Sequence, residues 1–163
     1  MARILVVDDD ALVCEVVTDC LREDLGAEVE CALTGARGAQ MITTMRFDLA
    51  LIGAVLPGVS GVALAEPAAN ENIPALLTSG HPEVCETLDR FNFRHLKKPF
   101  DLDTPVAEAT GIIRDTRENI RRVKASAAQM RANAEALNVA MEKARRQLDA
   151  IKVRQHDQDK TIG

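Results

Sequence analysis

Short apolar runs alternate with amphipathic stretches over residues 1–100 of the chain. Runs of four or five apolar residues are typical of parallel strands that are covered on both faces. Five strands are predicted, at Ile4–Val7, Val29–Leu33, Leu49–Ile52, Ala75–Leu77 and Phe93–Leu96, and three of them are near-continuous apolar runs. Because helical stretches and short links separate them, the pattern predicts an open, doubly wound α/β fold with a five-stranded parallel sheet.

The stretches between these strands carry signals for the starts and ends of helices. Asp10 is placed to cap the first helix, Gly26 to end it, and Thr34 to cap the second. The third helix, after Gly61, should be short or broken because Pro67 interrupts it. The residues expected to face inward are Leu12, Val13, Val16, Val17, Cys20 and Leu21 in the first helix, Ala39, Ile42 and Met45 in the second, and Val84, Cys85 and Leu88 in the fourth, which begins near Pro82.

After Pro99 the apolar spacing changes to alternating threes and fours, which is the heptad signature of a coiled coil. It predicts a long C-terminal helix from about 103 to 155 whose seam packs on another chain. Val106, Ala109, Thr116 and Ala144 belong to the repeat, and only Thr116 among its members is polar. The residues expected to form a homodimer contact are Ile113, Ile120, Val123, Ala127, Met130, Ala134, Leu137, Met141, Leu148 and Ile151.

The charge distribution divides the chain at the same place. Residues 1–111 hold 8 basic and 18 acidic residues, a net charge of −10, whereas residues 112–163 hold 12 and 7, a net charge of +5. We therefore predict a globular domain at 1–111, a continuous coiled-coil helix at 112–155 and a frayed polar tail at 156–163. Gly111 lies at an outward heptad position near the junction, where a bend would fit.

The orientation of the coiled coil stays open. One flank of the seam is basic and the other is neutral, so a parallel pair avoids the repulsion that an antiparallel pair would place between two basic flanks. The small residues Ala127, Ala134 and Ala144, by contrast, allow tight or antiparallel packing.

Composition indicates what kind of core the protein has and in which compartment it is expected. The chain has no Trp or Tyr and only four Phe, so the core must be aliphatic. No apolar run approaches the roughly 18 residues of a membrane-spanning helix, and the N-terminus lacks the features of a signal peptide. The four cysteines, Cys14, Cys20, Cys31 and Cys85, show no CxxC or metal-ligand spacing, so a reduced, cytoplasmic protein is expected.

Polar residues follow the predicted strands where a doubly wound sheet carries its site. Asp8-Asp9-Asp10 follows the first strand, Pro57-Gly58 with Gly61 the third, Thr78-Ser79-Gly80 the fourth and Lys97-Lys98-Pro99-Phe100 the fifth. This ordered set resembles the receiver domain of bacterial response regulators, which has a flavodoxin-like fold and acts in two-component phosphorelays. The resemblance covers residues 2 to about 111 and not the tail.

The resemblance implies roles for individual residues. In that family two acidic residues and an acceptor aspartate hold a divalent cation, and Asp8, Asp9 and the backbone carbonyl of Val55 match the metal ligands other than the acceptor. Thr78 and Lys98 match the hydroxyl and the lysine that contact the phosphoryl group. A further position, often an aromatic switch residue in the family, is His95 in this chain.

Glycine stands at position 53, where the family has its phosphoacceptor aspartate. Gly53 has no nucleophilic oxygen, so an acyl phosphate cannot form there. A Mg²⁺ site would also lose one anionic ligand and become weak or vestigial, and Lys98 would turn to Asp8 or Asp9. We therefore expect a non-enzymatic pseudo-receiver, with no required cofactor, that acts through dimerisation and through contacts with a histidine kinase or another signalling protein.

Other functions stay open at this point. Asp10 or Ser79 could replace the missing acceptor, or Gly53 could be an engineered change in an ordinary phosphoaccepting regulator. A nucleic-acid-binding role would use the basic side chains Arg114, Arg117, Arg121, Arg122 and Lys124. A solvated flank of a coiled coil is the simpler interpretation, because no helix-turn-helix or zinc motif accompanies them.

Overall fold

The computed structural model describes the backbone of residues 1–161 and the side chains of residues 1–147, 149 and 150. The chain divides into two compact units, Met1–Arg117 and Glu118–Gly163. In the described part of the chain, no helix combines the length and the apolar character that crossing a membrane requires.

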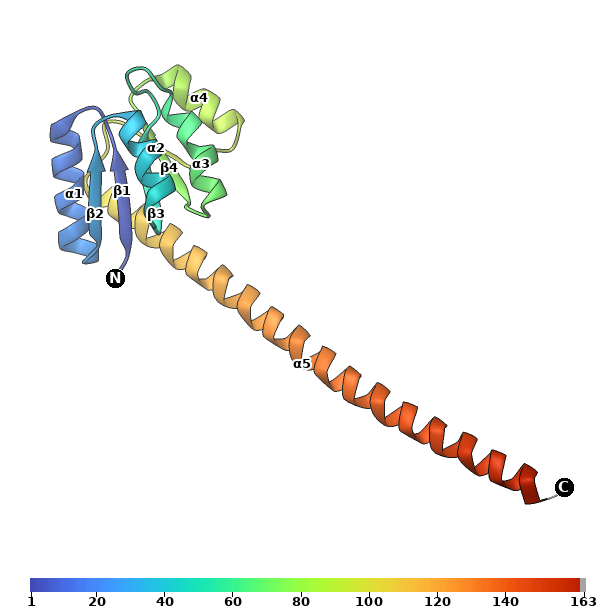
Figure 1. The fold of residues 1–163 in the computed structure, drawn as a ribbon. Coiled ribbons are helices and arrows are strands. Elements are labelled where there is room, and N and C mark those ends of the chain that lie inside the picture. The colour runs from blue at the N-terminus through green and yellow to red at the C-terminus, as the bar shows by residue number, and fades with distance from the viewer. Residues whose placement is uncertain (162–163) are drawn as a thin grey trace. The chain divides into compact units, whose positions relative to one another are not determined.

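The first unit is built on a parallel sheet of five strands with the order β2-β1-β3-β4-β5 (Figure 1). The strands are β1 (Arg3–Val7), β2 (Glu28–Ala32), β3 (Leu49–Gly53), β4 (Ala75–Ser79) and β5 (His95–Lys97). Each strand was predicted, with ends that differ by at most two residues from the observed ones. The order places β1, β3 and β4 in the centre, which explains why their sequences are nearly continuous apolar runs.

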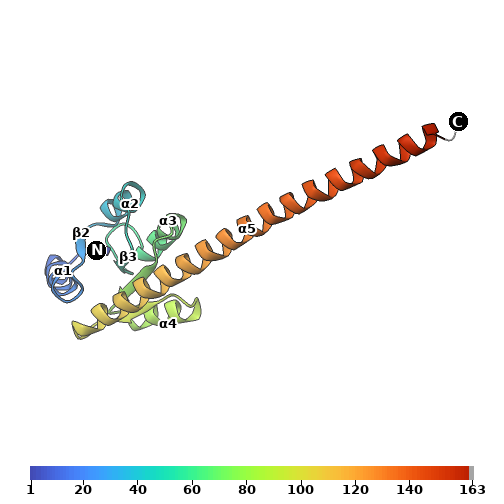
Figure 2. The same ribbon diagram turned by 90° about the horizontal axis from the view of Figure 1, so that it is seen from below.

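Helices cover both faces of this sheet, and the strands lie between them in both views (Figure 1, Figure 2). They are α1 (Ala11–Leu25), α2 (Gly35–Thr44), the 3₁₀ turn η1 (Gly61–Leu64), α3 (Ala65–Asn70), α4 (Pro82–Arg90) and α5 (Asp103–Thr161). One core lies under α2, α3 and α4, and the other lies under α1 and the first turns of α5. The doubly wound α/β architecture expected from the sequence is therefore confirmed.

The predicted helix signals are present in the structure. Asp10 caps α1 by accepting hydrogen bonds from the backbone N–H groups of Leu12 and Val13, at 2.9 and 3.3 Å. Gly26 ends α1 in the left-handed conformation, with φ of 58°, and Thr34 caps α2. The helix around Pro67 is short, six residues after a 3₁₀ turn, as its proline predicted.

The inward face of α1 was predicted partly wrongly. Its buried residues are Cys14, Val17, Thr18 and Leu21. Leu12 is 66% exposed, and Val13 and Val16 are only half-buried. The apolar stripe of α1 is wider than the surface that the sheet can cover, so its excess residues lie at the edge of the domain.

Helix α5 begins inside the first unit. Ala109, Ile112 and Ile113 are buried in the core that α1 shares, and Arg117 lies 3.4 Å from Asp48. Ile113 is therefore a core residue of its own domain and not the start of a free dimer seam, which corrects its sequence assignment.

The helix continues without interruption through Gly111 and ends at Thr161, beyond the predicted end near 155. It contains no proline after Pro105 and no glycine after Gly111, so nothing in the sequence stops it earlier. It thus includes most of the segment 156–163 that was expected to be a frayed tail. The side chains of the seam residues Leu148 and Ile151 lie outside the described residues.

A disulfide joins Cys14 of α1 to Cys31 of β2, while Cys20 and Cys85 are free thiols. The expectation of four reduced cysteines was wrong for this pair. The Cα atoms are 6.4 Å apart although 17 residues separate the two cysteines in sequence, because α1 packs back onto β2.

Candidate functional site

The carboxyl ends of the strands meet at one edge of the sheet, as the sequence predicted, and β1 delivers Asp8 there. Its carboxylate is nearly buried, and both of its oxygens are used. Oδ1 accepts the backbone N–H of Asp10 at 3.1 Å. Oδ2 accepts a hydrogen bond from Lys98 Nζ at 2.5 Å. A charged group that is removed from water needs such partners, and the contact with Lys98 offsets part of the cost of burying the carboxylate.

A polar cavity of about 320 Å³ opens beside this pair. Its lining brings together residues from the ends of four strands that are far apart in the sequence: Asp8, Asp9, Gly53, Val55, Thr78, Ser79, Gly80, His81 and Lys98. Every site position inferred from the family resemblance lies on this lining, with the exception of His95.

Gly53 is the last residue of β3 and pairs with Thr78 of β4. A Cβ atom built at Gly53 would lie 3.3 Å from Leu56 Cδ2, 3.4 Å from Asp8 Oδ2 and 3.5 Å from the Val7 carbonyl oxygen. These contacts are close but require only a small shift of one flexible leucine. The backbone therefore accepts a Cβ atom at position 53, and this chain has none there.

The loop after β3 is held against the end of that strand by Gly61. Its N–H donates to the carbonyl of Ala54 at 2.9 Å, and a Cβ atom at Gly61 would lie 1.8 Å from the carbonyl oxygen of Gly53. Only glycine allows this close approach. Gly58, at φ of 77°, makes the preceding turn. The Pro57-Gly58 and Gly61 signal thus positions the loop at the rim of the cavity.

The residues around Asp8 do not fit a magnesium site as they stand. Mg²⁺ takes oxygen ligands in a near-octahedral set. Here Asp8 Oδ2 already accepts a hydrogen bond from Lys98 Nζ, and Gly53 offers no side-chain oxygen. Asp9 is exposed, and Val55 lines the cavity from the following loop. Among the described residues, no three His, Cys, Asp or Glu side chains gather as a metal site.

Two hydroxyl groups come from the end of β4. Thr78 and Ser79 are both buried and line the cavity. Ser79 Oγ accepts the N–H of His81 at 3.1 Å, and its carbonyl accepts the N–H of Lys98 at 2.7 Å. The second of these bonds fixes the backbone of Lys98 to the end of β4, beside Asp8.

His95 lies in β5 and is not part of the cavity. Its Nδ1 is 3.1 Å from the carbonyl oxygen of Phe93, and its Nε2 is 3.9 Å from Asp89 Oδ1 at the end of α4. The imidazole therefore bridges β5 and α4, in the position that the family resemblance gives to a switch aromatic.

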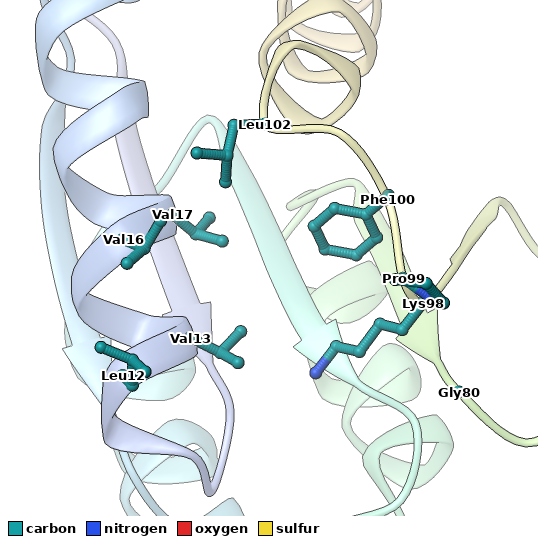
Figure 3. A pocket seen from close by; sticks show the side chains of 9 residues that line it. All are labelled: Leu12, Val13, Val16, Val17, Gly80, Lys98, Pro99, Phe100 and Leu102. Atoms are coloured by element: carbon teal, nitrogen blue, oxygen red, sulfur yellow. The ribbon is translucent and has the colours of Figure 1, made fainter.

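A second cavity, which sequence reasoning missed, lies next to the first. It measures about 610 Å³ and is almost entirely apolar. Figure 3 shows the valines and the leucine of α1 on one side and the segment from Lys98 to Leu102 on the other. The signal that could have revealed it is the excess width of the apolar stripe on α1, in which Leu12 is exposed and Val16 is only half-buried.

The second unit carries an exposed apolar seam. Within the single chain, Ile120 is 48% exposed, and Val123, Met130, Leu137 and Met141 are between 61% and 69% exposed. The basic residues predicted beside it, Arg121, Arg122 and Lys124, are exposed as well, and Arg122 pairs with Glu118 at 2.5 Å.

Comparison with known proteins identifies the globular unit. The family model described as the response regulator receiver domain matches residues 4–110. The chain belongs to this family. The CheY-like receiver domain of Methanospirillum hungatei JF-1 has a similar structure, with 25% identity and a TM-score of 0.66 over 73% of this chain and 98% of that one.

Two curated relatives are similar in sequence. The DNA-binding dual master transcriptional regulator RpaA of Synechocystis is 27% identical over 71% of this chain and 51% of its own length. The transcriptional regulatory protein CrdR of Helicobacter pylori is 31% identical over 62% of this chain and 50% of its own length. The chain thus spans about half the length of these relatives. It contains a response regulator receiver domain of two-component signalling, followed by a long C-terminal helix.

Proposed function

We propose that this protein is a pseudo-receiver: a receiver domain that takes part in two-component signalling through protein contacts and does not accept a phosphoryl group at position 53. One combination of features carries the proposal: position 53 is glycine, and Lys98 donates a hydrogen bond directly to Asp8. The acceptor oxygen is absent, and the lysine already has an anionic partner inside the domain. The pocket is thus held in one state without metal or phosphate.

The two substitute acceptors are poorly placed for phosphoryl transfer. Asp10 uses Oδ1 to cap α1 through two backbone N–H groups. Ser79 Oγ accepts the N–H of His81 and has no adjacent general base among its hydrogen-bond partners. We therefore propose no enzymatic activity for the domain.

The proposed output is association through α5. The seam residues from Ile120 to Met141 leave large apolar side chains in water when the chain is alone. A two-stranded coiled coil buries such a seam, and the 3.5-residue repeat of these positions matches that geometry. We propose that a second copy covers the seam and that a histidine kinase or another signalling protein binds the receiver unit.

Phosphoryl transfer from acetyl phosphate in the presence of Mg²⁺ tests the proposal. Intact mass spectrometry of the native protein should show no phosphorylated species. Gly53→Asp should gain one phosphoryl group, because a Cβ atom fits at that position after a small shift of Leu56, and Gly53→Asn is the matched control that should gain none. Phosphorylation of the unaltered protein would overturn the proposal.

A further inference from the structure

The disulfide between Cys14 and Cys31 joins a buried residue to an accessible one. Cys14 is 2% exposed in the core under α1, whereas Cys31 is an exposed residue of β2. Strand β2 is the edge of the sheet and pairs only with β1. We propose that the pair is a thiol–disulfide exchange site for small thiols and disulfides of the glutathione class, with Cys31 as the residue attacked and Cys14 as the resolving residue.

Reduction proceeds from the accessible side. A small thiolate attacks Sγ of Cys31, the Cys14 sulfur leaves as a thiolate and takes a proton, and a mixed disulfide remains on Cys31. A second thiolate then attacks the sulfur of the small thiol in that mixed disulfide and releases Cys31 as a thiol. Two small thiols become one small disulfide, and the two electrons reduce the protein disulfide to two thiols. Oxidation by a small disulfide follows the same steps in reverse.

The core around Cys14 accommodates both redox states. Its Sγ lies 3.6 Å from the carbonyl oxygen of Asp8. A disulfide sulfur has no proton to donate, but after reduction the thiol of Cys14 can donate a weak hydrogen bond to this carbonyl. A buried thiol without such a partner would be less favourable, so the contact makes the reduced state compatible with the folded domain.

Both ends of the disulfide connect to the polar cavity. The N–H of Asp8 donates to the carbonyl of Ala32, the neighbour of Cys31, at 3.2 Å, and the N–H of Cys14 donates to the carbonyl of Asp10 at 3.0 Å. Asp10 in turn donates its N–H to Asp8. The redox state of the pair therefore acts on the segment that holds the ion pair of Asp8 with Lys98.

Exchange with glutathione disulfide tests the inference on the full-length protein, after reduction and removal of reductant. Acid-quenched intact mass should show that the wild type loses two hydrogens, and peptide mapping should place the new bond between Cys14 and Cys31. Cys14→Ala should instead accumulate one glutathione on Cys31, and Cys20→Ala should behave as the wild type. A wild type that stays fully reduced in excess glutathione disulfide, or glutathione on Cys20 rather than Cys31, overturns the proposal.

A second measurement covers the case in which the Cys14 variant does not fold. Cys31→Ser changes an exposed position, so the domain should remain folded. Dithiothreitol should lower the melting temperature of the wild type by about 5–10 °C, the effect expected for opening a disulfide-closed loop of this length. The melting temperature of Cys31→Ser should not respond, and an equal response in both proteins contradicts the assignment.

Nuclear magnetic resonance tests the connection to the cavity. Reduction of the wild type should shift the backbone amide signals of Asp8, Asp10 and Lys98, and it should leave that of Phe91, at the end of α4, nearly unchanged. Unchanged signals for Asp8 and Asp10 would overturn this coupling.

Discussion

At the residue scale, the ion pair between Asp8 and Lys98 is the contact on which the proposed single state of the pocket rests. Asp8 is nearly buried and Lys98 is 28% exposed, so the pair is shielded only in part. Removal of one partner from a pair of this kind costs more than the pair itself contributes, because the remaining buried charge loses its solvation and its partner together. The absence of an acceptor carboxylate leaves Lys98 with this single strong anionic contact.

Substitution of Lys98 should therefore be costly. We expect Lys98→Met to lower the free energy of unfolding by about 2–4 kcal/mol, measured by urea denaturation near neutral pH. Lys97→Met changes the exposed neighbouring lysine and should cost less than about 0.5 kcal/mol. The double variant Asp8→Asn with Lys98→Met should recover part of the loss, and a loss that is equal for Lys97 and Lys98 would contradict the role of the pair.

Substitution of glycine by alanine should have opposite effects on stability at positions 61 and 111. Gly61→Ala should destabilise the domain by more than about 3 kcal/mol, because its Cβ would overlap the carbonyl of Gly53 at 1.8 Å. Gly111→Ala should stabilise it by up to about 1 kcal/mol, since nothing lies within 4 Å of the added atom in a helix interior. Thermal unfolding of both variants checks the signs, and a stabilised Gly61→Ala would contradict the loop geometry.

The thiol of Cys20 should react slowly. Partial burial, followed by the charges of Asp24, Glu23, Asp19 and Asp103, raises the pKa of this thiol above its ordinary value of 9.0. The neutral thiol therefore dominates at pH 7, so alkylation by iodoacetamide should be slow there and its rate should still be rising with pH above 9. Asp24→Asn should increase the rate at fixed pH, and a rate equal to that of a free cysteine peptide would contradict the prediction.

At the element scale, the sequence predicts what depends on local pattern. Apolar runs located all five strands, and Asp10, Gly26 and Thr34 marked helix ends, because capping and periodicity are properties of neighbouring residues. The exposure of Leu12, the burial of Ile113 and the Cys14–Cys31 bond were missed. Each depends on which surfaces meet after folding, and a heptad register cannot distinguish a seam that faces its own domain from one that faces a partner.

The candidate site, like the fold, was predictable from the sequence where it depends on local pattern and not where it depends on tertiary packing. Residues at strand ends could be assigned to one edge of the sheet, and the turn of Lys98 toward Asp8 was expected once Gly53 was recognised. The wide apolar stripe of α1 signals one wall of the apolar cavity, but the other wall is the loop after β5, and only tertiary packing shows that the two leave a space.

Two neighbouring positions of α5 allow a controlled test of the proposed dimer interface. Leu137 lies on the seam and Val139 lies on the opposite face, and the two are similarly exposed in the single chain, at 61% and 67%. Leu137→Glu should raise the dimer dissociation constant by about 10–100-fold, because each copy would place a carboxylate in an apolar contact. Val139→Glu should change it less than about threefold by analytical ultracentrifugation. Equal effects of the two substitutions would show that the seam is not the interface.

At the scale of the whole molecule, the two units have different chemistry. The receiver unit is acidic and has glycine at position 53, whereas the helix after it is basic and carries the apolar seam. An ordinary receiver controls its output through phosphorylation. In this protein we propose that the output, association through the helix, requires no phosphoryl group, and that the internal ion pair keeps the receiver unit in one state.

Sedimentation equilibrium of the full-length protein, with and without Mg²⁺ and beryllofluoride, tests most directly whether association needs a phosphoryl group. Beryllofluoride mimics a phosphoryl group on an acceptor aspartate. We predict the mass of a dimer under both conditions, with the same dissociation constant. A protein that is monomeric alone and dimerises only when Mg²⁺ and beryllofluoride are added would contradict the pseudo-receiver with a phosphate-independent output.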